Sequence, residues 1–463
     1  MKIEKLKYVY LVGIGGIGMS ALARYFKHLG CVVAGYDKTE TELTKALVKE
    51  GIAITYIDLI SRIAETFKTN LNEEMAIIYT PAIPKDSSIL NYFKNQKFEM
   101  FKRSEVLGLI ASNYKTIAIA GTHGKTTTTT LTSHLVSSIL GNCHAFLGGI
   151  STNFNSNLIL SNYAKYCIVE ADEFDRSFLT LNPEISVITS TDADHLDIYG
   201  NANSLTDTYS LFAKRLSASG TLIAHANANI RTGGINKVLR YNIEKKDGIQ
   251  IWAENIKVVN GSFEFDYISP LGNLEGVRLN VPGRHNVENT LAAITIALLL
   301  HAEKERIKKS IASFTGVKRR FEYIIKTEKL VYIDDYAHHP TEIEAFVNAL
   351  KEVYPNKKIT GIFQPHLYSR TRDFMQGFAD SLGKLDEVVL MNIYPARELP
   401  IEGISSQALL EMIPNKNKYL VDDKNLIEFI KNRDTEILAT IGAGDIDKQI
   451  LPIKNTLIEK YRV

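Results

Sequence analysis

The 463-residue chain has few of the residues that mark disulfide-bonded, membrane-spanning or strongly charged proteins. Its three cysteines, Cys31, Cys143 and Cys167, are too widely spaced for a metal-ligand or redox pair. No apolar run approaches the roughly 18–20 residues that span a bilayer, and glycines interrupt the apolar stretch near the N-terminus. The formal net charge is only +2, which predicts neither a nucleic-acid nor a membrane partner. We expect a cytoplasmic protein that is a monomer or a weak homodimer.

The residues that are present favour an α/β fold. Apolar residues make up 45% of the chain, which is enough for several buried cores. An apolar strand, a glycine-containing turn and an amphipathic helix recur along the chain, a pattern typical of βαβ units with mostly parallel sheets. The predicted strands include 8–14, 116–120, 331–337, 359–363, 387–391 and 437–441. On a prior of roughly 100–200 residues per domain, we predict three domains, 1–107, 108–316 and 317–463.

The strongest local motif lies between a predicted strand and a predicted helix. Glycines allow backbone N–H groups to approach a polyphosphate, Lys125 can reach its outer phosphates, and the Thr126 hydroxyl can bind Mg²⁺. Ile119 stands where the full phosphate-loop pattern has glycine, so a shortened loop is expected. A glycine turn with a surface lysine is the alternative, but the strand–loop–helix context favours phosphate binding. The predicted ATP-binding residues here are Gly121, Thr122, His123, Gly124, Lys125, Thr126 and Thr127.

Acidic residues follow two further predicted strands. Carboxylates at the carboxyl end of a parallel strand lie at the edge where ligands bind in open α/β sheets, and oxygen ligands suit Mg²⁺. A helix cap or a solvated acidic loop is the alternative for each group alone. Next to a phosphate loop, the metal interpretation is favoured. The two groups are Glu170, Asp172 and Glu173 after 167–169, and Asp192, Asp194 and His195 after 187–190.

The N-terminal loop fits the G-x-G-x-x-G pattern, with Asp37 near the usual distance after the next strand. This pattern is typical of a nicotinamide cofactor site. It also fits any other diphosphate on the N-terminus of the following helix, and the loop alone leaves both open. Its glycines are Gly13, Gly15, Gly16 and Gly18.

Other polar groups lie at predicted strand ends and helix starts. Asn286 and Asn289 open an apolar helix, where capping is locally favoured over contact with an adenine edge. Arginines at the second domain boundary and after a further predicted strand suit phosphate or carboxylate, although a solvated surface is their usual role. These other groups are Lys318, Arg319, Arg320, Asp334, Asp335, His338, His339, His366, Arg370 and Arg372.

The motifs, taken in order, resemble those of the Mur ligases, and the resemblance covers essentially the whole chain. It implies Rossmann-like N- and C-terminal domains around a central ATP-binding P-loop domain. The implied reaction is ATP-dependent and passes through an acyl phosphate, joining L-alanine to the carboxylate of UDP-N-acetylmuramate for peptidoglycan. A ligase that recycles murein tripeptide is the alternative within the family. The motifs span 13–18, 121–127, 170–173 with 194–195, 283–289, 316–321 and 334–342.

The resemblance also implies residue roles. Gly13, Gly15, Gly16, Gly18 and Asp37 would hold the UDP part of the sugar substrate rather than NAD. Lys125 would contact the β- and γ-phosphates, Thr126 and Glu173 would hold one Mg²⁺, and His195 would help to place a second. Asn286, Asn289, Arg320 and Asp335 would lie near ATP, with His338 near ATP and the amino acid and Arg370 near the substrate. His195 and His338 are both candidate proton acceptors.

The chain departs from the family pattern at two places. Leu367 stands where related enzymes often have arginine, so that contact would come from Arg370 or Arg372. The stretch 206–210 has no lysine, so we predict no carbamylated lysine. Two readings outside the ligases also stay open: an oxidoreductase, supported only by the first glycine-rich loop, and a P-loop ATPase switch.

Overall fold

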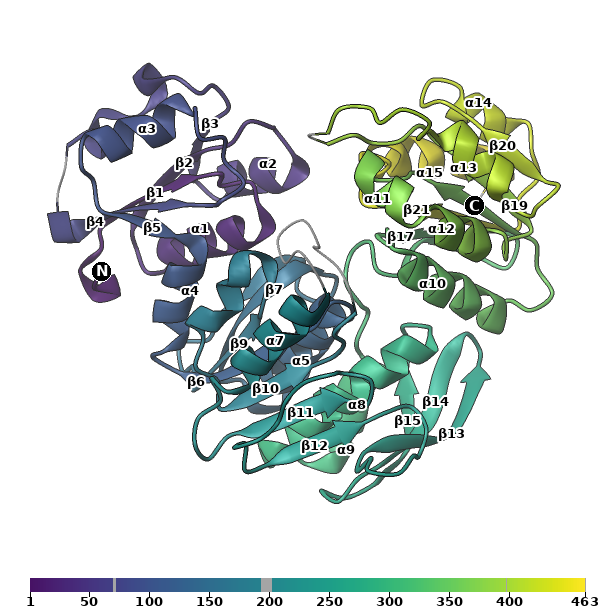
Figure 1. Cartoon of the computed structure of the whole chain (residues 1–463), viewed down its shortest axis with the longest axis horizontal. Coiled ribbons are helices and arrows are strands. Elements are labelled where there is room, and N and C mark those ends of the chain that lie inside the picture. The colour runs from purple at the N-terminus through teal and green to yellow at the C-terminus, as the bar shows by residue number, and fades with distance from the viewer. Residues whose placement is uncertain (70–71, 193–201, 397, 463) are drawn as a thin grey trace. The chain divides into compact units, whose positions relative to one another are not determined.

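The computed structural model describes the chain except residues 70–71, 193–201, 397 and 463 (Figure 1). It divides into two compact units. The first unit comprises Met1–Trp252, Ile268–Gly272 and Asn289–Ser310, and the second comprises Ala253–Tyr267, Asn273–Glu288 and Ile311–Val463. Two units do not by themselves divide the chain at 107 and 317, so the predicted domain boundaries stay predictions.

The first sheet is entirely parallel, with the order β3-β2-β1-β4-β5. Alternate residues of its central strand point to opposite faces. Val9 and Leu11 join one core with helix α1, while Tyr10 and Val12 join another with α3. Both faces are therefore covered, as expected for parallel strands. The elements are β1 (Tyr8–Val12), α1 (Ile17–His28), β2 (Val32–Tyr36), α2 (Glu42–Lys49), β3 (Ala53–Thr55), β4 (Met75–Tyr79), α3 (Ser88–Asn95), β5 (Met100–Lys102) and α4 (Arg103–Ala111).

The second sheet has seven strands in the order β12-β11-β10-β6-β9-β7-β8, and only β7 and β8 pair antiparallel. Residues of α1, such as Leu22 and Phe26, share one core with Val169 and Phe146 of this sheet. This shared core fixes the first sheet against the second within the first unit. The elements are β6 (Lys115–Ala120), α5 (Lys125–Leu140), β7 (Cys143–Ser151), β8 (Ser156–Ile159), β9 (Tyr166–Glu170), β10 (Ile185–Ile188), α7 (Ala202–Ala213), β11 (Thr221–His225), β12 (Val238–Tyr241), α8 (Arg284–Leu299) and α9 (Lys304–Ala312).

A third, three-stranded sheet was not predicted. Its strands are β13 (Trp252–Val259), β14 (Ser262–Ile268) and β15 (Leu274–Leu279), and β14 pairs antiparallel with β15. Phe263, Phe265 and Tyr267 are buried and alternate with the acidic residues Glu264 and Asp266. This period of two is the signal that could have identified the strand.

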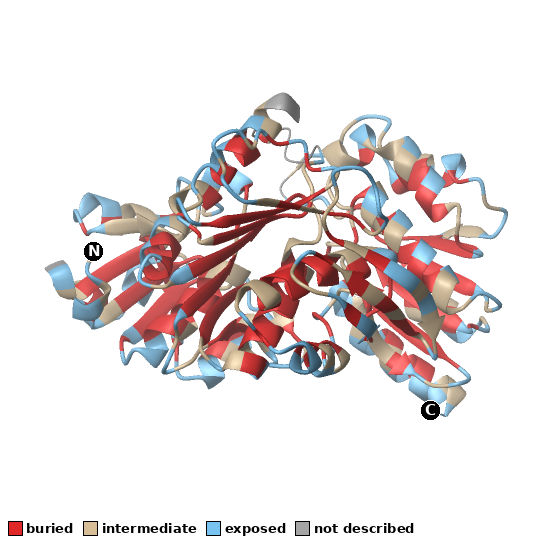
Figure 2. Cartoon of the chain, turned by 90° about the horizontal axis from the view of Figure 1, so that it is seen from below, coloured by how far each residue is buried: buried red, intermediate tan, exposed pale blue. Residues whose placement is uncertain are grey.

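The fourth sheet forms the core of the second unit, with the order β16-β17-β21-β18-β19-β20. All neighbours are parallel except the edge strand β16, which pairs antiparallel with β17. The inner strands β17, β21, β18 and β19 are buried along their whole length, whereas the edge strands β16 and β20 are only partly buried; buried residues are red in Figure 2. The elements are β16 (Glu322–Lys326), β17 (Val331–Asp335), α10 (Pro340–Val353), β18 (Ile359–Phe363), α11 (Tyr368–Asp373), α12 (Met375–Leu382), β19 (Glu387–Leu390), α13 (Ser406–Met412), β20 (Lys418–Leu420), α14 (Leu426–Lys431), β21 (Ile437–Ile441) and α15 (Asp447–Tyr461).

The α/β fold class and the parallel strands that were predicted are confirmed. Strands β18 and β21 have the predicted bounds, while the strand predicted at 8–14 ends two residues earlier, at Val12. All three cysteines are free and buried, which fits small core residues. Among the described residues, no helix combines the length and hydropathy needed to cross a membrane.

Candidate active site

The loop between β6 and α5 is held by the end of the neighbouring strand β10. Gly121 (φ +134°) and Gly124 (φ +81°) adopt backbone conformations that favour glycine. The N–H of His123 donates to Ser190 Oγ at 2.8 Å, and the Thr122 hydroxyl donates to the Asp192 carbonyl at 2.8 Å. These contacts fix the loop at the carboxyl edge of the sheet. Thr126 and Thr127 lie in the first turn of α5.

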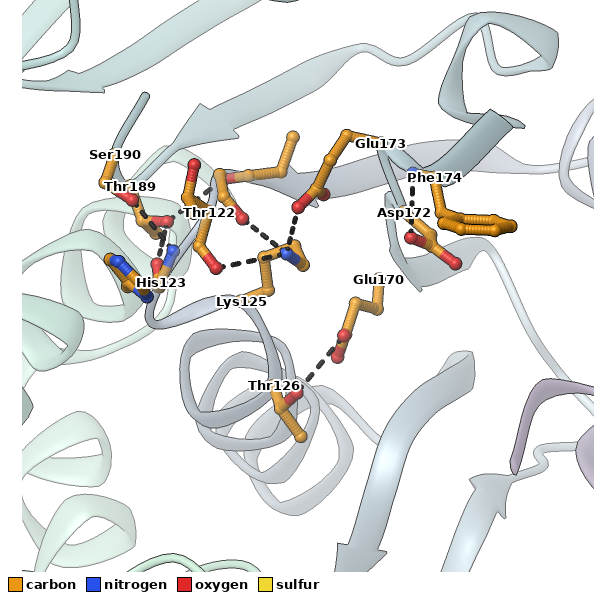
Figure 3. A network of polar contacts seen from close by, with 12 residues as sticks. Thr122, His123, Lys125, Thr126, Glu170, Asp172, Glu173, Phe174, Thr189 and Ser190 are labelled. Atoms are coloured by element: carbon orange, nitrogen blue, oxygen red, sulfur yellow. Dashed lines mark hydrogen bonds and ion pairs between the residues drawn. The ribbon is translucent and has the colours of Figure 1, made fainter. Parts of the chain in front are cut away.

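Lys125 lies against this loop and forms an ion pair with an acidic residue after β9 (Figure 3). Its Nζ donates to the Gly121 carbonyl at 2.6 Å and to Glu173 Oε1 at 2.7 Å. Burial alone would lower the pKa of Lys125, but the carboxylates of Glu173 and Glu170 outweigh it and raise the pKa. Lys125 is therefore a protonated cation at neutral pH, able to offset phosphate charge.

The Thr126 hydroxyl contacts Glu170, the first of the acidic residues at the end of β9. It donates to Glu170 Oε1 at 3.1 Å (Figure 3). Glu170 Oε2 accepts the N–H of Gly148 at 3.2 Å. A Cβ at Gly148 would lie 2.2 Å from Glu170 Oε2, so a larger residue there would displace this carboxylate. Glu170 thus joins Thr126 and Glu173 as a potential oxygen ligand. Within the described parts of the chain, no three His, Cys, Asp or Glu side chains converge into a protein-only metal site.

The first glycine-rich loop is organised by Asp37. Its Oδ2 accepts the N–H of Gly15 at 2.8 Å, and a Cβ at Gly15 would lie 2.8 Å from the same oxygen. Gly13 has φ +90°, and Gly16 is the N-cap of α1. Asp37 therefore supports the backbone of the loop. Whether it also contacts a ligand stays a prediction.

A cavity of about 280 Å³ lies between this loop and the acidic end of β9. The first turn of α1, from Gly16 to Met19, lines it together with Arg103. Glu170 and Asp172 line it as well, and Glu170 contacts Thr126 of the phosphate loop. The cavity thus extends from the first glycine-rich loop to a carboxylate that touches the second.

The two asparagines of α8 have different surroundings. Asn289 Oδ1 accepts the Thr128 hydroxyl at 3.1 Å, and a Cβ at Gly124 would lie 2.5 Å from the same oxygen. Asn289 therefore packs against the phosphate loop. Asn286, which lies in the second unit, donates from Nδ2 to the Pro282 carbonyl at 2.6 Å, a contact local to the helix start. Their contact with adenine stays a prediction.

In the second unit, Asp335 is held by backbone groups. It accepts the N–H of Phe321 at 2.7 Å and that of Ala337 at 2.8 Å. Burial raises its pKa to about 6, although Arg320 and these N–H groups oppose the shift. Arg320 lies over the Tyr336 ring at 5.2 Å. Asp335 therefore ties the loop after β17 to the segment that carries Arg320.

A second group of polar side chains in this unit consists of His338, Glu342, His366 and Arg370. The Nδ1 of His338 lies 3.0 Å from the Tyr336 carbonyl and 3.4 Å from Glu342 Oε2, and burial lowers the pKa of His338. Arg370 Nη1 lies 3.4 Å from His366 Nδ1. Burial, with help from Arg370, lowers the pKa of His366 to about 4. Both histidines are therefore neutral at neutral pH.

Several predicted residues are not brought together by the described structure. Asp194 and His195 lie outside the described residues. Leu367, where related enzymes often carry arginine, has φ +70°, and Arg372 pairs with Asp373 on the surface. The sequence reasoning missed Arg103 as a cavity residue, because its partner Asp172 is 69 positions away.

Comparison with known proteins accounts for the order of these motifs. Three family models match: the catalytic domain of the Mur ligase family at 8–115, the Mur ligase middle domain at 119–297, and the Mur ligase glutamate ligase domain at 319–446. The chain belongs to the Mur ligase family. The family predicted from the motifs is thereby confirmed.

Full-length relatives within the Mur ligases are closely similar. A UDP-N-acetylmuramate–L-alanine ligase from Christiangramia forsetii is 47% identical, covering 99% of both chains. One of the same name from Cytophaga hutchinsonii is 45% identical, covering 100% of this chain and 99% of the relative. A solved UDP-N-acetylmuramate–alanine ligase from Thermotoga maritima has a TM-score of 0.80 at 26% identity and covers 98% of this chain and 99% of its own. A murein peptide ligase from Psychrobacter arcticus has a TM-score of 0.70 at 19% identity, covering 97% and 98%, and shows the fold alone.

Proposed function

We propose that this Mur ligase joins L-alanine to the carboxylate of UDP-N-acetylmuramate with ATP, in peptidoglycan precursor synthesis. The observation that carries the proposal is the cavity that extends from the diphosphate-type loop at Gly16 to Glu170 beside the phosphate loop. A sugar nucleotide bound there would place its diphosphate at α1 and its carboxylate toward ATP. The relatives named UDP-N-acetylmuramate–L-alanine ligase support the same substrates.

The reaction requires activation, because a carboxylate is a poor acyl donor. A carboxylate oxygen attacks the γ-phosphorus of ATP, ADP leaves with the bonding pair, and an acyl phosphate forms. The amine of L-alanine then attacks the carbonyl carbon, and phosphate leaves. The part of Lys125 is to offset the charge of the outer phosphates, while the loop N–H groups position them.

The oxygen donors beside the phosphate loop fit Mg²⁺. The hydroxyl of Thr126 and the carboxylates of Glu170 and Glu173 are hard ligands, and Mg²⁺ often takes only one or two carboxylates together with phosphates and water. When bound, the ion would neutralise charge on the transferring phosphate. We place Glu170 beside the predicted Glu173 in this role because it already contacts Thr126.

His338 is the proposed proton acceptor for the amine. A backbone carbonyl can only accept, so the Tyr336 carbonyl holds the neutral ring with its proton on Nδ1 and leaves Nε2 able to accept. Replacing His338 with glutamine should lower kcat and remove the acidic limb of its pH profile. A variant that keeps both would remove His338 from this role.

Phosphate release with ATP, Mg²⁺ and UDP-N-acetylmuramate tests the function, with each candidate amine added in turn. We expect release that depends on both the sugar nucleotide and L-alanine. Release that demands a tripeptide would replace the proposal with the recycling ligase. Release without any sugar nucleotide would point to an ATPase.

A further inference from the structure

We propose that Arg103 binds the diphosphate of the sugar nucleotide and gives up its ion pair with Asp172 to do so. The inference rests on the proposed function and adds a binding residue to it. Arg103 is the first residue of α4 and lines the cavity that extends from the first glycine-rich loop to Glu170.

The position of Arg103 places its guanidinium at the start of α1. A Cβ at Gly18 would lie 2.8 Å from Arg103 Nη1 and 3.0 Å from its Cδ, so the side chain extends directly over this glycine. Gly18 belongs to the first turn of α1, whose N–H groups have no partner within the helix. A diphosphate that accepts from these groups therefore lies within reach of the guanidinium.

The charges of the cavity point to the same role. Among the described residues that line it, Arg103 is the one basic side chain, while Glu170 and Asp172 are acidic. The loop 13–18 contains no lysine or arginine, and Asp37 adds a negative charge beside it. A positive charge at this loop can therefore come only from outside the segment 13–18, and Arg103 supplies one. Arginine suits phosphate because its planar fork can donate two parallel hydrogen bonds.

Arg103 can exchange its ion-pair partner, the carboxylate of Asp172, for the diphosphate of the ligand. Arg103 Nη2 donates to Asp172 Oδ2 at 3.1 Å, and the two side chains are 20% and 40% exposed. A pair this accessible to water contributes little stability, so a doubly charged diphosphate competes well against a single carboxylate. Asp172 Oδ1 also accepts the N–H of Phe174 at 3.1 Å, which holds the aspartate in place after the exchange.

The test is calorimetric binding of UDP and of UDP-N-acetylmuramate to the full chain without ATP. Arg103→Ala should weaken both ligands about 10- to 100-fold, the value of a hydrogen-bonded charge contact, and Arg103→Lys should recover part of the loss. In turnover, R103A should raise the KM for the sugar nucleotide and leave the KM for ATP within about twofold. A loss confined to UDP-N-acetylmuramate would overturn the proposal, because Arg103 would then serve the carboxylate.

Asp172→Asn separates binding from a structural role. If Asp172 only competes with the diphosphate, D172N should bind UDP as tightly as the unchanged chain or a few-fold more tightly. If the ion pair merely holds the fold, D172N should weaken UDP as R103A does, which would overturn the proposal. Arg231→Ala, which breaks the exposed pair with Asp207 in the same unit, is the matched control and should leave UDP affinity unchanged.

Failure of this inference is distinguishable from failure of the proposed function. Phosphate release that depends on UDP-N-acetylmuramate and L-alanine in the unchanged chain tests the function by itself. With that activity present, unaltered UDP binding by R103A overturns only the role of Arg103.

Discussion

The two glycine-rich loops follow parallel strands and precede helices, yet they handle charge in opposite ways. The loop before α5 carries its own cation and hydroxyl, Lys125 and Thr126, each paired with a glutamate. The loop before α1 has no lysine and no hydroxyl of its own, and the carboxylate of Asp37 accepts a hydrogen bond from its Gly15 N–H. The loop before α1, which is the first along the chain, is therefore suited to bind a diphosphate that stays intact. The second is suited to stabilise phosphate charge that changes during a reaction.

Removing the divalent ion should separate the loops most strongly. With excess EDTA we expect ATP turnover to fall below detection, because the proposed Mg²⁺ donors Thr126, Glu170 and Glu173 lie beside the second loop. Calorimetric affinity for UDP should stay within about twofold, since helix N–H groups bind phosphate without a metal. If EDTA weakened UDP binding as strongly as it reduced ATP turnover, the two loops would not differ in their need for a divalent ion.

Replacing Lys125 with methionine should have the next largest effect. We expect kcat/KM for ATP to fall about 10³-fold, or about 4 kcal/mol, because the phosphate charge loses its buried cation. The free energy of unfolding should also fall by about 3–5 kcal/mol, because Glu173 is left buried without its ion pair. Thermal unfolding measures this loss. The double variant K125M/E173Q should regain stability and not turnover. Recovery of turnover would show that Lys125 acts only through Glu173.

Alanine at equivalent glycines should reveal a steric difference. Gly124→Ala requires a Cβ at φ +81° and 2.5 Å from Asn289 Oδ1, so we expect a loss of about 2 kcal/mol in unfolding free energy. Gly16→Ala has φ −65° and meets nothing nearer than 3.6 Å, so it should cost less than about 1 kcal/mol. Denaturant unfolding of the two variants compares them directly, and equal losses would be inconsistent with this difference.

The smallest effect is expected at Asp37. Asp37→Ala removes the acceptor for the Gly15 N–H, which we expect to raise the KM for the sugar nucleotide about fivefold, or about 1 kcal/mol. Asp37→Asn keeps an acceptor oxygen and should change KM less. If D37A instead altered the KM for ATP, the two loops would not be functionally distinct.

Much of the fold could be predicted because parallel strands that are buried on both faces are short apolar runs between glycine turns. Strand β18 is such an apolar run. Helix α10 could be predicted for a different reason, because proline is typical of the first helical position and Pro340 begins the helix. The antiparallel strand β14 was not predicted although Phe263 and Phe265 alternate with acids, because it belongs to a hairpin and not to a unit of strand and helix. His195 lies outside the described residues, so its role stays a prediction.

The sequence by itself determined the local devices: the two glycine-rich loops, the lysine and hydroxyl of the second, and the acids after β9. Only the tertiary structure decided which partner each side chain takes. Lys125 pairs with Glu173, Thr126 pairs with Glu170, and Arg103 pairs with Asp172. The physical reason is distance along the chain. These partners are 44 to 69 positions apart. The pairing of β6 with β9 brings the first two pairs together, and the packing of α4 against the segment after β9 brings the third together; no local pattern encodes either contact.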